Sequence, residues 1–419
     1  MFYSSGLTGP VNFSMSNSST NNSSANKGGV LYSDFEDGVI EIVNSGFYNS
    51  SAADIAGAMD ITANSVSNGS VIFRKNTFDT NSSVGTAGAI YCKNQTNFLI
   101  ENSAFLNNEA SSGGAMSLND CNMTIESTVF DGNESVSYSG GAMYVLSDSI
   151  IDMSEVDFVN NVSVQHGAGI YMRDSSLVAD DLFADGNSAD WYGVALGAED
   201  SSIDLTNSEF SNNVNTGSGP YCGAVMTFDS DFSGDNLIVQ DNDSGGGICF
   251  FDNGLGSFSL TDSQISNNVY GLYAGGVLIE AISNLLNVVI DGVDFIGNQS
   301  TVNGGGLSII GTPSYSHSVT VSNSSFEGNV AMFDSMATAT EGGGGLSCDN
   351  LDGISIYNTS FVGNIAEPTH NGKGGAIRAQ NCGLDLNEVD GFDMKSLIFN
   401  LLSEKGQSQA LGLKSSQFE

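Results

Sequence analysis

A four-residue signature, three small residues closed by an aliphatic residue or Met, recurs along nearly the whole of this chain of 419 residues. It is clearest at Gly113-Gly114-Ala115-Met116, and its thirteen copies lie roughly 23 to 39 residues apart. They occupy 28–31, 56–59, 87–90, 113–116, 140–143, 167–170, 193–196, 222–225, 245–248, 274–277, 304–307, 343–346 and 374–377. A period in this range indicates a solenoid, in which each repeat adds one coil and buries its apolar face only against its neighbours.

A second signature, Phe-x-x-Asn, precedes most of these tetrads. Its copies are Phe78/Asn81, Phe105/Asn108, Phe130/Asn133, Phe158/Asn161, Phe210/Asn213, Phe295/Asn298, Phe326/Asn329 and Phe361/Asn364, with Val239/Asn242 and Ile265/Asn268 as conservative versions. Phe183/Asn187 is one residue too long, and Phe47 is followed by Ser50 in place of Asn. We expect the Phe to fill the interior as a ladder and the Asn to lie at a corner, where stacked amides bond along the axis.

Apolar residues alternate with mixed residues after each tetrad. In the fourth copy Met116 and Leu118 are apolar and Ser117 lies between them, and Met143, Tyr144 and Val145 repeat the pattern. This period of two predicts a strand with one face inward, and a second strand is predicted before each Phe. The sequence therefore predicts an all-β fold, a parallel β-helix of about a dozen coils. We assign residues 1–27 to a low-complexity first-coil segment, 28–387 to the repeat domain and 388–419 to a cap or linker.

Three regions depart from the repeat. The Ser- and Asn-rich run from Ser14 to Asn26 predicts a loop on the first coil. Longer connections at 312–317, 330–341 and 365–373 gather in the late coils, where binding loops of solenoids tend to lie. Residues 393–405 have a helix-like pattern, with Asp393 as N-cap and Gly406 just past the end, and predict either a helix that caps the last coil or a linker.

The charge of the chain excludes some partners. Forty-eight Asp and Glu residues against ten Lys and Arg give a formal net charge of −38, which rules against binding nucleic acid or an anionic membrane. Two explanations of this acidity stay open, solubility and weak binding of divalent cations at many sites. No stretch of 18 apolar residues is present, so we expect no transmembrane helix.

The repeated tetrapeptides resemble those of the polymorphic outer membrane proteins of chlamydiae. The copies at 113–116, 140–143 and 374–377 carry the likeness, which covers roughly residues 28 to 382. The resemblance implies a right-handed parallel β-helix exposed at a cell surface, the passenger part of an autotransporter with a role in adhesion.

Residues for catalysis are sparse in the repeats. The Lys and Arg side chains are scattered over distant coils, whereas a β-helical lyase would need a base beside carboxylates that hold a cation. Asp180-Asp181 is the only adjacent acidic pair within a repeat, and it stands near Arg173 and His166. Strand alternation would point the two carboxylates to opposite faces. We treat these four residues as weak catalytic candidates and expect a non-catalytic protein.

Metal and disulfide sites are also poorly supported. His166, His317 and His370 belong to different coils and have no Cys or His at metal-ligand spacing, so we expect neither a metal site nor a cofactor. Cys92 and Cys348 fall in the inward column and are predicted to be buried apolar residues. Cys121 and Cys382 share a corner position nine coils apart, too far to bridge. Cys222 and Cys249 lie in successive coils but in different columns, and we expect no bond between them.

Outward aromatic residues give the one candidate binding face. Tyr144 and Tyr171 occupy the same position in adjacent coils, and Tyr91 lies two coils before Tyr144. Such a row could stack on a surface glycan or a protein ligand, or it could simply cover backbone.

The functional hypothesis is therefore an extracellular or cell-surface, adhesin-like repeat protein, in the outer membrane if bacterial. The alternatives are a carbohydrate-active lyase or hydrolase, or a structural fragment of a larger parent protein that holds a membrane anchor. The start shows no signal peptide, so we expect a leader outside this sequence. Asn-x-Ser/Thr tripeptides are frequent, for example at Asn49, Asn68 and Asn358, although chance explains about half of them in a chain so rich in Asn and Ser.

Overall fold

The computed structural model describes residues 2–4, 11–35, 37–217, 223–243, 245–254, 256–271, 273–281, 287–312, 318–332, 342–366, 375–391 and 397–400. Within these ranges the regular structure is β-strand throughout, and parallel coils give about 12 turns of β-solenoid in all. The predicted all-β fold is confirmed. The chain divides into two compact units, Met1–Ser218 and Gly219–Glu419, which are described separately.

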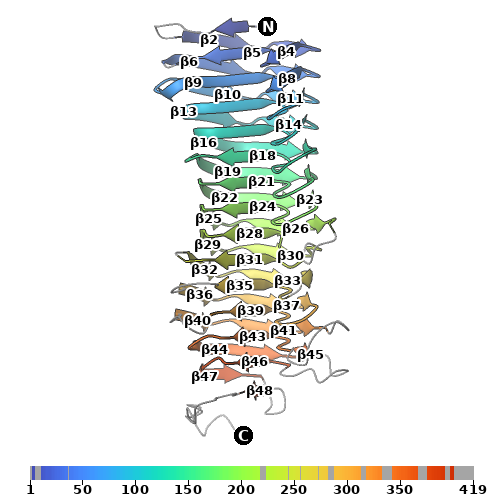
Figure 1. Ribbon diagram of the computed structural model, residues 1–419, viewed down its shortest axis with the longest axis vertical. Coiled ribbons are helices and arrows are strands. Elements are labelled where there is room, and N and C mark those ends of the chain that lie inside the picture. The colour runs from blue at the N-terminus through green and yellow to red at the C-terminus, as the bar shows by residue number, and fades with distance from the viewer. Residues whose placement is uncertain are drawn as a thin grey trace. The chain divides into compact units, whose positions relative to one another are not determined.

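In the first unit each coil contributes a strand that opens at the tetrad, and this strand pairs in parallel with its counterpart one coil later (Figure 1). The tetrad strands are β5 (Leu31–Asp34), which also pairs with β1 (Phe2–Ser4), β9 (Met59–Ser67), β13 (Ile90–Glu101), β16 (Met116–Asp131), β18 (Met143–Leu146), β21 (Ile170–Arg173) and β24 (Leu196–Glu199).

The chain then turns and forms further strands before the next tetrad. The second series contains β2 (Val11–Ser16), β6 (Gly38–Val43), β10 (Ser70–Arg74), β19 (Ile150–Val159), β22 (Ser176–Asp185), β25 (Ser202–Thr206) and the later parts of β13 and β16. The series that carries the Phe contains β3 (Ser19–Asn21), β7 (Gly46–Tyr48), β11 (Thr77–Asp79), β14 (Ala104–Leu106), β26 (Glu209–Ser211) and the ends of β16, β19 and β22. A separate sheet follows the Asn and contains β4 (Ser24–Lys27), β8 (Ser51–Ile55), β12 (Ser82–Ser83), β15 (Glu109–Ala110), β17 (Glu134–Ser135), β20 (Val162–Ser163), β23 (Ser188–Ala189) and β27 (Val214–Asn215).

The second unit repeats this plan. Its tetrad strands are β28 (Val225–Phe228), β31 (Ile248–Asp252), β35 (Val277–Ala281), β39 (Leu307–Ile310), β43 (Leu346–Asp349), β46 (Ile377–Gln380) and β48 (Leu397–Asn400). The second series is β29 (Asp231–Asp235), β32 (Ser257–Thr261), β36 (Asn287–Asp291), β40 (Ser318–Ser322), β44 (Ile354–Val362) and β47 (Leu384–Asp390), and the next is β30 (Ile238–Gln240), β33 (Gln264–Ser266), β37 (Asp294–Ile296), β41 (Ser325–Glu327) and the end of β44. The strands after the Asn are β34 (Val269–Gly271), β38 (Gln299–Ser300), β42 (Val330–Ala331) and β45 (Ile365–Ala366).

The Phe residues form the predicted ladder in the core of the first unit. Phe78, Phe105, Phe130 and Phe158 are at most 1% exposed, and each ring stacks on the next with centroids 4.8 Å apart. This spacing equals the distance between neighbouring strands, so the rings follow the register of the backbone. Stacking is therefore a direct consequence of placing one Phe at the same position of every coil.

One coil breaks the Phe ladder. Ala184 pairs with Phe158 and Phe210 in the strand register, so Ala184, and not Phe183, occupies the Phe column. Asn187 is then three residues further on, as in the regular motif, and takes its usual place in the Asn ladder. The motif seemed one residue too long because Phe183 points outward and the next residue, Ala184, holds the inward position.

The corner asparagines form a buried ladder along each unit. Asn133 is typical: its Nδ2 donates to Asn161 Oδ1 (2.9 Å) and to the carbonyl of Phe105 (3.0 Å), and its backbone N–H donates to the same Asn161 oxygen (3.0 Å). Ser50 takes the ladder position in its coil, where its N–H donates to Asn81 Oδ1. Each Asn side chain thereby satisfies backbone groups that the corner would otherwise leave unpaired in the interior.

Glycines of the tetrad are required by close backbone approach. Gly113 has a φ of 62°, and a Cβ on it would lie 2.2 Å from the Met116 carbonyl oxygen. Gly114 has an ordinary φ, but a Cβ there would lie 2.2 Å from the carbonyl oxygen of Gly141 in the next coil. The first glycine therefore serves the turn, and the second allows the coils to pack.

Two disulfides correct the prediction that Cys92 and Cys348 are isolated buried residues. Cys92 is bonded to Cys121, with Cα atoms 6.3 Å apart, and Cys348 is bonded to Cys382, with Cα atoms 6.1 Å apart. In each pair the first cysteine stands two residues after the end of a tetrad and the second stands five residues after the end of the next. The prediction compared Cys121 and Cys382 with each other, at equal positions of distant coils, and did not consider a bond from either one to an inward cysteine of the coil before. Cys249 is buried, and Cys222 lies outside the described residues.

Two further predictions about the chain ends are wrong. Residues 14–26 do not form a loop, because β2, β3 and β4 in this range pair with β6, β7 and β8 of the next coil. The predicted helix over 393–405 is contradicted where the structure describes it, since Leu397–Asn400 is the strand β48 and pairs with β46. The hydrogen bonds gained by pairing with the open edge of β46 outweigh the local preference for a helix that the spacing of the apolar residues suggests.

Candidate ligand-binding site

The predicted tyrosine row is only partly continuous. Tyr144 in β18 and Tyr171 in β21 are paired in register, and their rings stack 5.5 Å apart at 12°. Tyr91 is separated from Tyr144 by Ser117, which holds the same position in β16 and is 3% exposed. Tyr171 is itself only 7% exposed. The row therefore does not form an open face at Tyr171.

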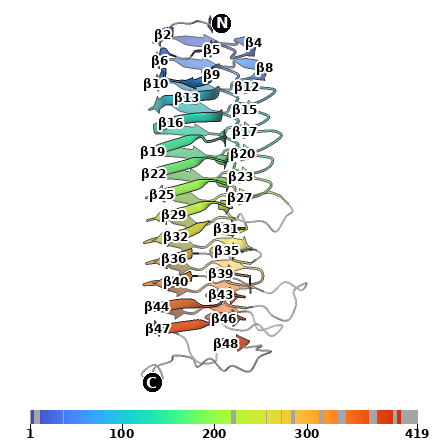
Figure 2. The same cartoon turned by 60° about the vertical axis from the view of Figure 1, so that its left-hand side comes forward.

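The turns before the tetrads cover this row and extend it. Figure 2 shows these turns, after β15, β17, β20 and β23, projecting along one side of the first unit. His166, in the turn after β20, stacks on Tyr171 at 5.8 Å, and Tyr192, in the turn after β23, stacks on His166 at 5.1 Å. Trp191 meets His166 edge to face at 5.6 Å and Tyr192 at 6.1 Å. We call Tyr144, Tyr171, His166, Trp191 and Tyr192 the aromatic cluster.

The outer end of the aromatic cluster is open to solvent. Trp191, the only Trp of the chain, is 52% exposed. Tyr138, in the turn after β17, is 57% exposed. Ser163 Oγ lies 3.0 Å from the carbonyl oxygen of Tyr138 and 3.1 Å from that of His166, which ties the two turns together. Exposed aromatic rings on turns with fixed backbones make a rigid surface for a flat apolar ligand.

Polar groups border Trp191. The side chain of Asn215 donates to the Trp191 carbonyl, and the Trp191 N–H donates to the carbonyl of Gln165 at 3.0 Å. Beside Trp191, the exposed carboxylate of Asp190 accepts a hydrogen bond from Thr216 Oγ1 at 2.6 Å. The backbone of Trp191 is thus fixed on both sides, and the exposed carboxylate of Asp190 belongs to the residue just before it in the chain.

His166 is held as a neutral ring. Its Nδ1 accepts a hydrogen bond from the Tyr192 backbone N–H at 3.3 Å, which leaves the proton on Nε2. Burial lowers the pKa of His166 below its usual value. Burial, together with the charge and the hydrogen bond of Glu199, raises the pKa of Tyr171. Both rings therefore stay uncharged at neutral pH, and the cluster presents aromatic faces without a formal charge of its own.

The structure does not join the four catalytic candidates. Asp180 accepts hydrogen bonds from Asn207 (2.6 Å) and Thr206 (2.9 Å), which lower the pKa of its carboxyl. Asp181 has a φ of 57° and is exposed at a corner of β22. Arg173 lies 3.8 Å from Asp174. No hydrogen bond or ion pair links His166, Arg173, Asp180 and Asp181 to one another.

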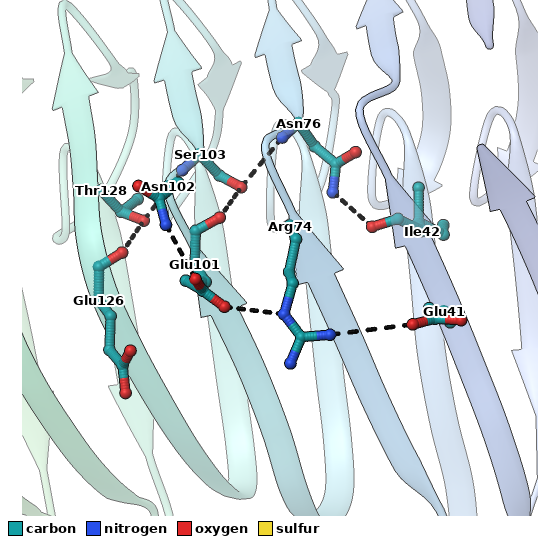
Figure 3. Close-up of polar contacts among 9 residues, drawn as sticks. All are labelled: Glu41, Ile42, Arg74, Asn76, Glu101, Asn102, Ser103, Glu126 and Thr128. Atoms are coloured by element: carbon teal, nitrogen blue, oxygen red, sulfur yellow. Dashed lines mark hydrogen bonds and ion pairs between the residues drawn. The ribbon is translucent and has the colours of Figure 1, made fainter. Parts of the chain in front are cut away.

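The N-terminal coils contain a polar hollow of about 340 Å³, open to solvent. Hydroxyl and amide groups line it together with Tyr48 and Lys75, as follows: Asn17, Ser18, Ser19, Asn44, Ser45 and Thr77. The neighbouring Arg74 is paired with two carboxylates: its Nε lies 2.7 Å from Glu101 and its Nη1 lies 3.8 Å from Glu41 (Figure 3). Two residues after Arg74, Asn76 Nδ2 donates to the Ile42 carbonyl and the Asn76 backbone N–H donates to Ser103 Oγ (Figure 3).

One buried carboxyl lies in the same outward column as the tyrosines. Asp60 pairs with Tyr32 and Tyr91 in the register, is 1% exposed, and neither of its carboxylate oxygens has a hydrogen-bond partner. Burial raises its pKa to about 7, and nearby Lys27 lowers the pKa only in part. Asp60 is therefore a buried acid that titrates near neutrality.

The described part of the chain contains no group of three or more His, Cys, Asp and Glu side chains that could hold a metal ion. His317, His370 and most of the predicted late binding loops, at 313–317, 333–341 and 367–374, lie outside the described residues. In the ranges that the structure describes, no helix is long and apolar enough to cross a membrane.

Sequence reasoning found Tyr144 and Tyr171 as one row but placed His166 among the catalytic candidates, and it missed Trp191 and Tyr192. The available signal was the chain's single Trp beside a Tyr, immediately before a tetrad. Comparison with known proteins adds no relative from which a role could be read: no family model, curated protein or solved structure matches this chain.

Proposed function

We propose that this protein is a non-catalytic, secreted or surface-exposed β-solenoid that binds a neutral saccharide at the aromatic cluster. The observation that carries the proposal is Trp191, half exposed and held edge to face against the rings of His166 and Tyr192. A pyranose ring has an apolar face of C–H groups that suits a fixed aromatic plane, and its hydroxyls suit nearby acceptors such as Asp190.

Charge supports a neutral ligand over an acidic one. The chain carries a formal net charge of −38, and the carboxylates of Glu134, Asp190 and Glu199 belong to the same stretch of turns and strands as the aromatic cluster. A sulfated or carboxylated polysaccharide would meet a repulsive field on approach. A hexose or N-acetylhexosamine polymer would not.

The two disulfides support a location outside the reducing cytoplasm. Such bonds persist in secreted proteins and at cell surfaces, and they are rare where thiols are kept reduced. The solenoid and the repeated tetrapeptides are also consistent with a surface passenger of the kind found in the polymorphic outer membrane proteins. On this proposal the regular coils are a scaffold, and the turns before the tetrads are the adhesive part.

The test is binding to an array of neutral and acidic glycans, followed by titration calorimetry on the best ligand. We expect binding to neutral glycans, with affinity about tenfold lower in Trp191→Ala, because one stacking contact contributes on the order of 1 kcal/mol. Tyr357→Ala is the matched control, since Tyr357 is 41% exposed and lies in the second unit. Absence of binding, or binding that Trp191→Ala leaves unchanged, refutes the site. Release of shortened glycan refutes the non-catalytic assignment.

A further inference from the structure

Several rungs of the buried Asn ladder stand in the tripeptide that accepts Asn-linked oligosaccharide. These tripeptides are Asn81-Ser82-Ser83, Asn133-Glu134-Ser135, Asn161-Val162-Ser163, Asn242-Asp243-Ser244 and Asn298-Gln299-Ser300. All five asparagines are 0% exposed. Acceptor sites normally lie on surface loops of secreted proteins, so their position in the interior is a conflict between sequence and fold.

Both amide hydrogens of Asn81, Asn133, Asn161 and Asn298 are already used. Asn161 Nδ2 donates to the Phe130 carbonyl (2.9 Å) and to Asn187 Oδ1 (3.0 Å), and Asn298 Nδ2 donates to the Ile265 carbonyl (2.8 Å) and to Asn329 Oδ1 (3.0 Å). A glycosidic bond replaces one of these hydrogens with a sugar. It would leave a buried acceptor unpaired and would place a bulky polar group where no exposed surface remains.

We infer that this chain is built for an oxidising compartment that does not attach Asn-linked oligosaccharide to it. The enzyme that transfers the oligosaccharide to Asn acts on an extended chain, before the coil has formed. Burial of these asparagines in the folded ladder therefore comes too late to prevent the modification. Once modified, that rung cannot enter the interior, and the coils on both sides lose their neighbour. The two disulfides require oxidation, while the ladder requires that these five tripeptides stay unmodified.

Outward tripeptides provide an internal comparison. Asn49, Asn68 and Asn358 stand in the same tripeptide but are exposed, so an oligosaccharide on them would extend into solvent. The acceptor sites can be removed without touching any Asn by changing the third residue to Ala. Ser300 suits this change because its hydroxyl has no hydrogen-bond partner.

The experiment is secretion of the full chain from a yeast that performs Asn-linked glycosylation. Two variants are compared with the unaltered chain. In the ladder variant Ser83, Ser135, Ser163, Ser244 and Ser300 become Ala, and in the outward variant Ser51, Ser70 and Ser360 become Ala. All three chains are also made in a bacterial periplasm, where the circular dichroism of each must show a folded β protein before the comparison is used.

We expect the unaltered chain and the outward variant to be retained in yeast with sugar on ladder asparagines, as read by mass spectrometry, and the ladder variant to be secreted in several-fold larger amount. Equal secretion of the unaltered chain and the ladder variant overturns the inference. So does an unaltered chain that is secreted folded with sugar at Asn161, or an unaltered chain that is secreted with all five ladder sites empty. If the ladder variant alone fails to fold in the periplasm, single Ser300→Ala and Ser83→Ala chains replace it, and each is expected to lose the sugar only at its own site.

Discussion

Cys92 is cross-linked to Cys121, which lies one coil further on and three residues beyond Leu118, the residue paired with Cys92 in the strand register. The bond closes a loop with a sequence separation of 29 residues. Because closing such a loop restricts the unfolded chain, we expect the double change Cys92→Ser and Cys121→Ser to lower the free energy of unfolding by about 3.5 kcal/mol. Urea denaturation of the purified variant measures this. A loss below about 1 kcal/mol would show that the cross-link is not a stabilising element.

The Asn ladder predicts a large cost for removing one rung. In Asn161→Ala the Phe130 carbonyl loses its donor, and the N–H and Nδ2 of Asn133 lose their acceptor, all in a site that is 0% exposed. We expect the free energy of unfolding to fall by about 3–5 kcal/mol. Asn97→Ala is the control, since Asn97 is exposed and bonds only Ser70, and should change it by at most about 0.5 kcal/mol. Similar effects in the two variants would contradict the role of the ladder.

Asp60 predicts a pH dependence of stability. Burial raises its pKa to about 7 in the folded protein from an ordinary value of 3.8, so the folded state binds the proton more tightly than the unfolded state. Protonation of Asp60 therefore contributes on the order of 4 kcal/mol to the free energy of unfolding. This contribution is fully present below about pH 4 and is lost as the pH rises through about 7.

The change Asp60→Asn removes this titration. We expect the variant to be more stable than the unaltered protein at pH 8 and the difference to shrink steadily towards pH 4, as measured by chemical denaturation across the range. The exposed Asp204 changed to Asn should give no such trend. A difference independent of pH would show that Asp60 does not titrate in this window.

Lys75 predicts a gain in stability. It has a φ of 56° at a corner where the neighbouring coils place Asn44 and Asn102, also at positive φ. Asn tolerates this left-handed conformation better than Lys does, and Asn44 Nδ2 already donates to Asn17 Oδ1 along the same corner. We therefore expect Lys75→Asn to raise the free energy of unfolding by roughly 1 kcal/mol, and Lys75→Val to lower it by roughly 1–2 kcal/mol. Thermal melts of the two variants should move in opposite directions.

Periodic residues made most of the fold predictable. One coil determines its neighbours, so the tetrad strands, the Phe ladder and the Asn corner could all be aligned from equal positions in the repeat. The prediction failed where a contact joins unequal positions, as between Cys92 and Cys121. It also failed where local pattern competed with stacking, since the helical spacing of 393–405 gave way to the strand β48.

The candidate site was less predictable for a related reason. The column that holds Tyr171 points away from the core, and outward residues of a strand are ordinarily exposed. Here the turn with His166 folds back over the ring, and the exposed surface passes to Trp191 in the following turn. A repeat pattern gives no information on how a turn of irregular sequence folds over an adjacent strand.

The Asn ladder also has a direction. Each amide donates forward, to the oxygen of the Asn one coil later, and back, to a carbonyl of the coil before, as Asn133 does between Phe105 and Asn161. Every Asn of the ladder therefore needs the same acceptor from the next coil, an Asn side-chain oxygen, whichever coil that is. A lineage could lengthen or shorten such a chain by whole coils without altering the chemistry of any join, whereas a gain or loss of part of a coil would leave donors and acceptors facing the wrong partners.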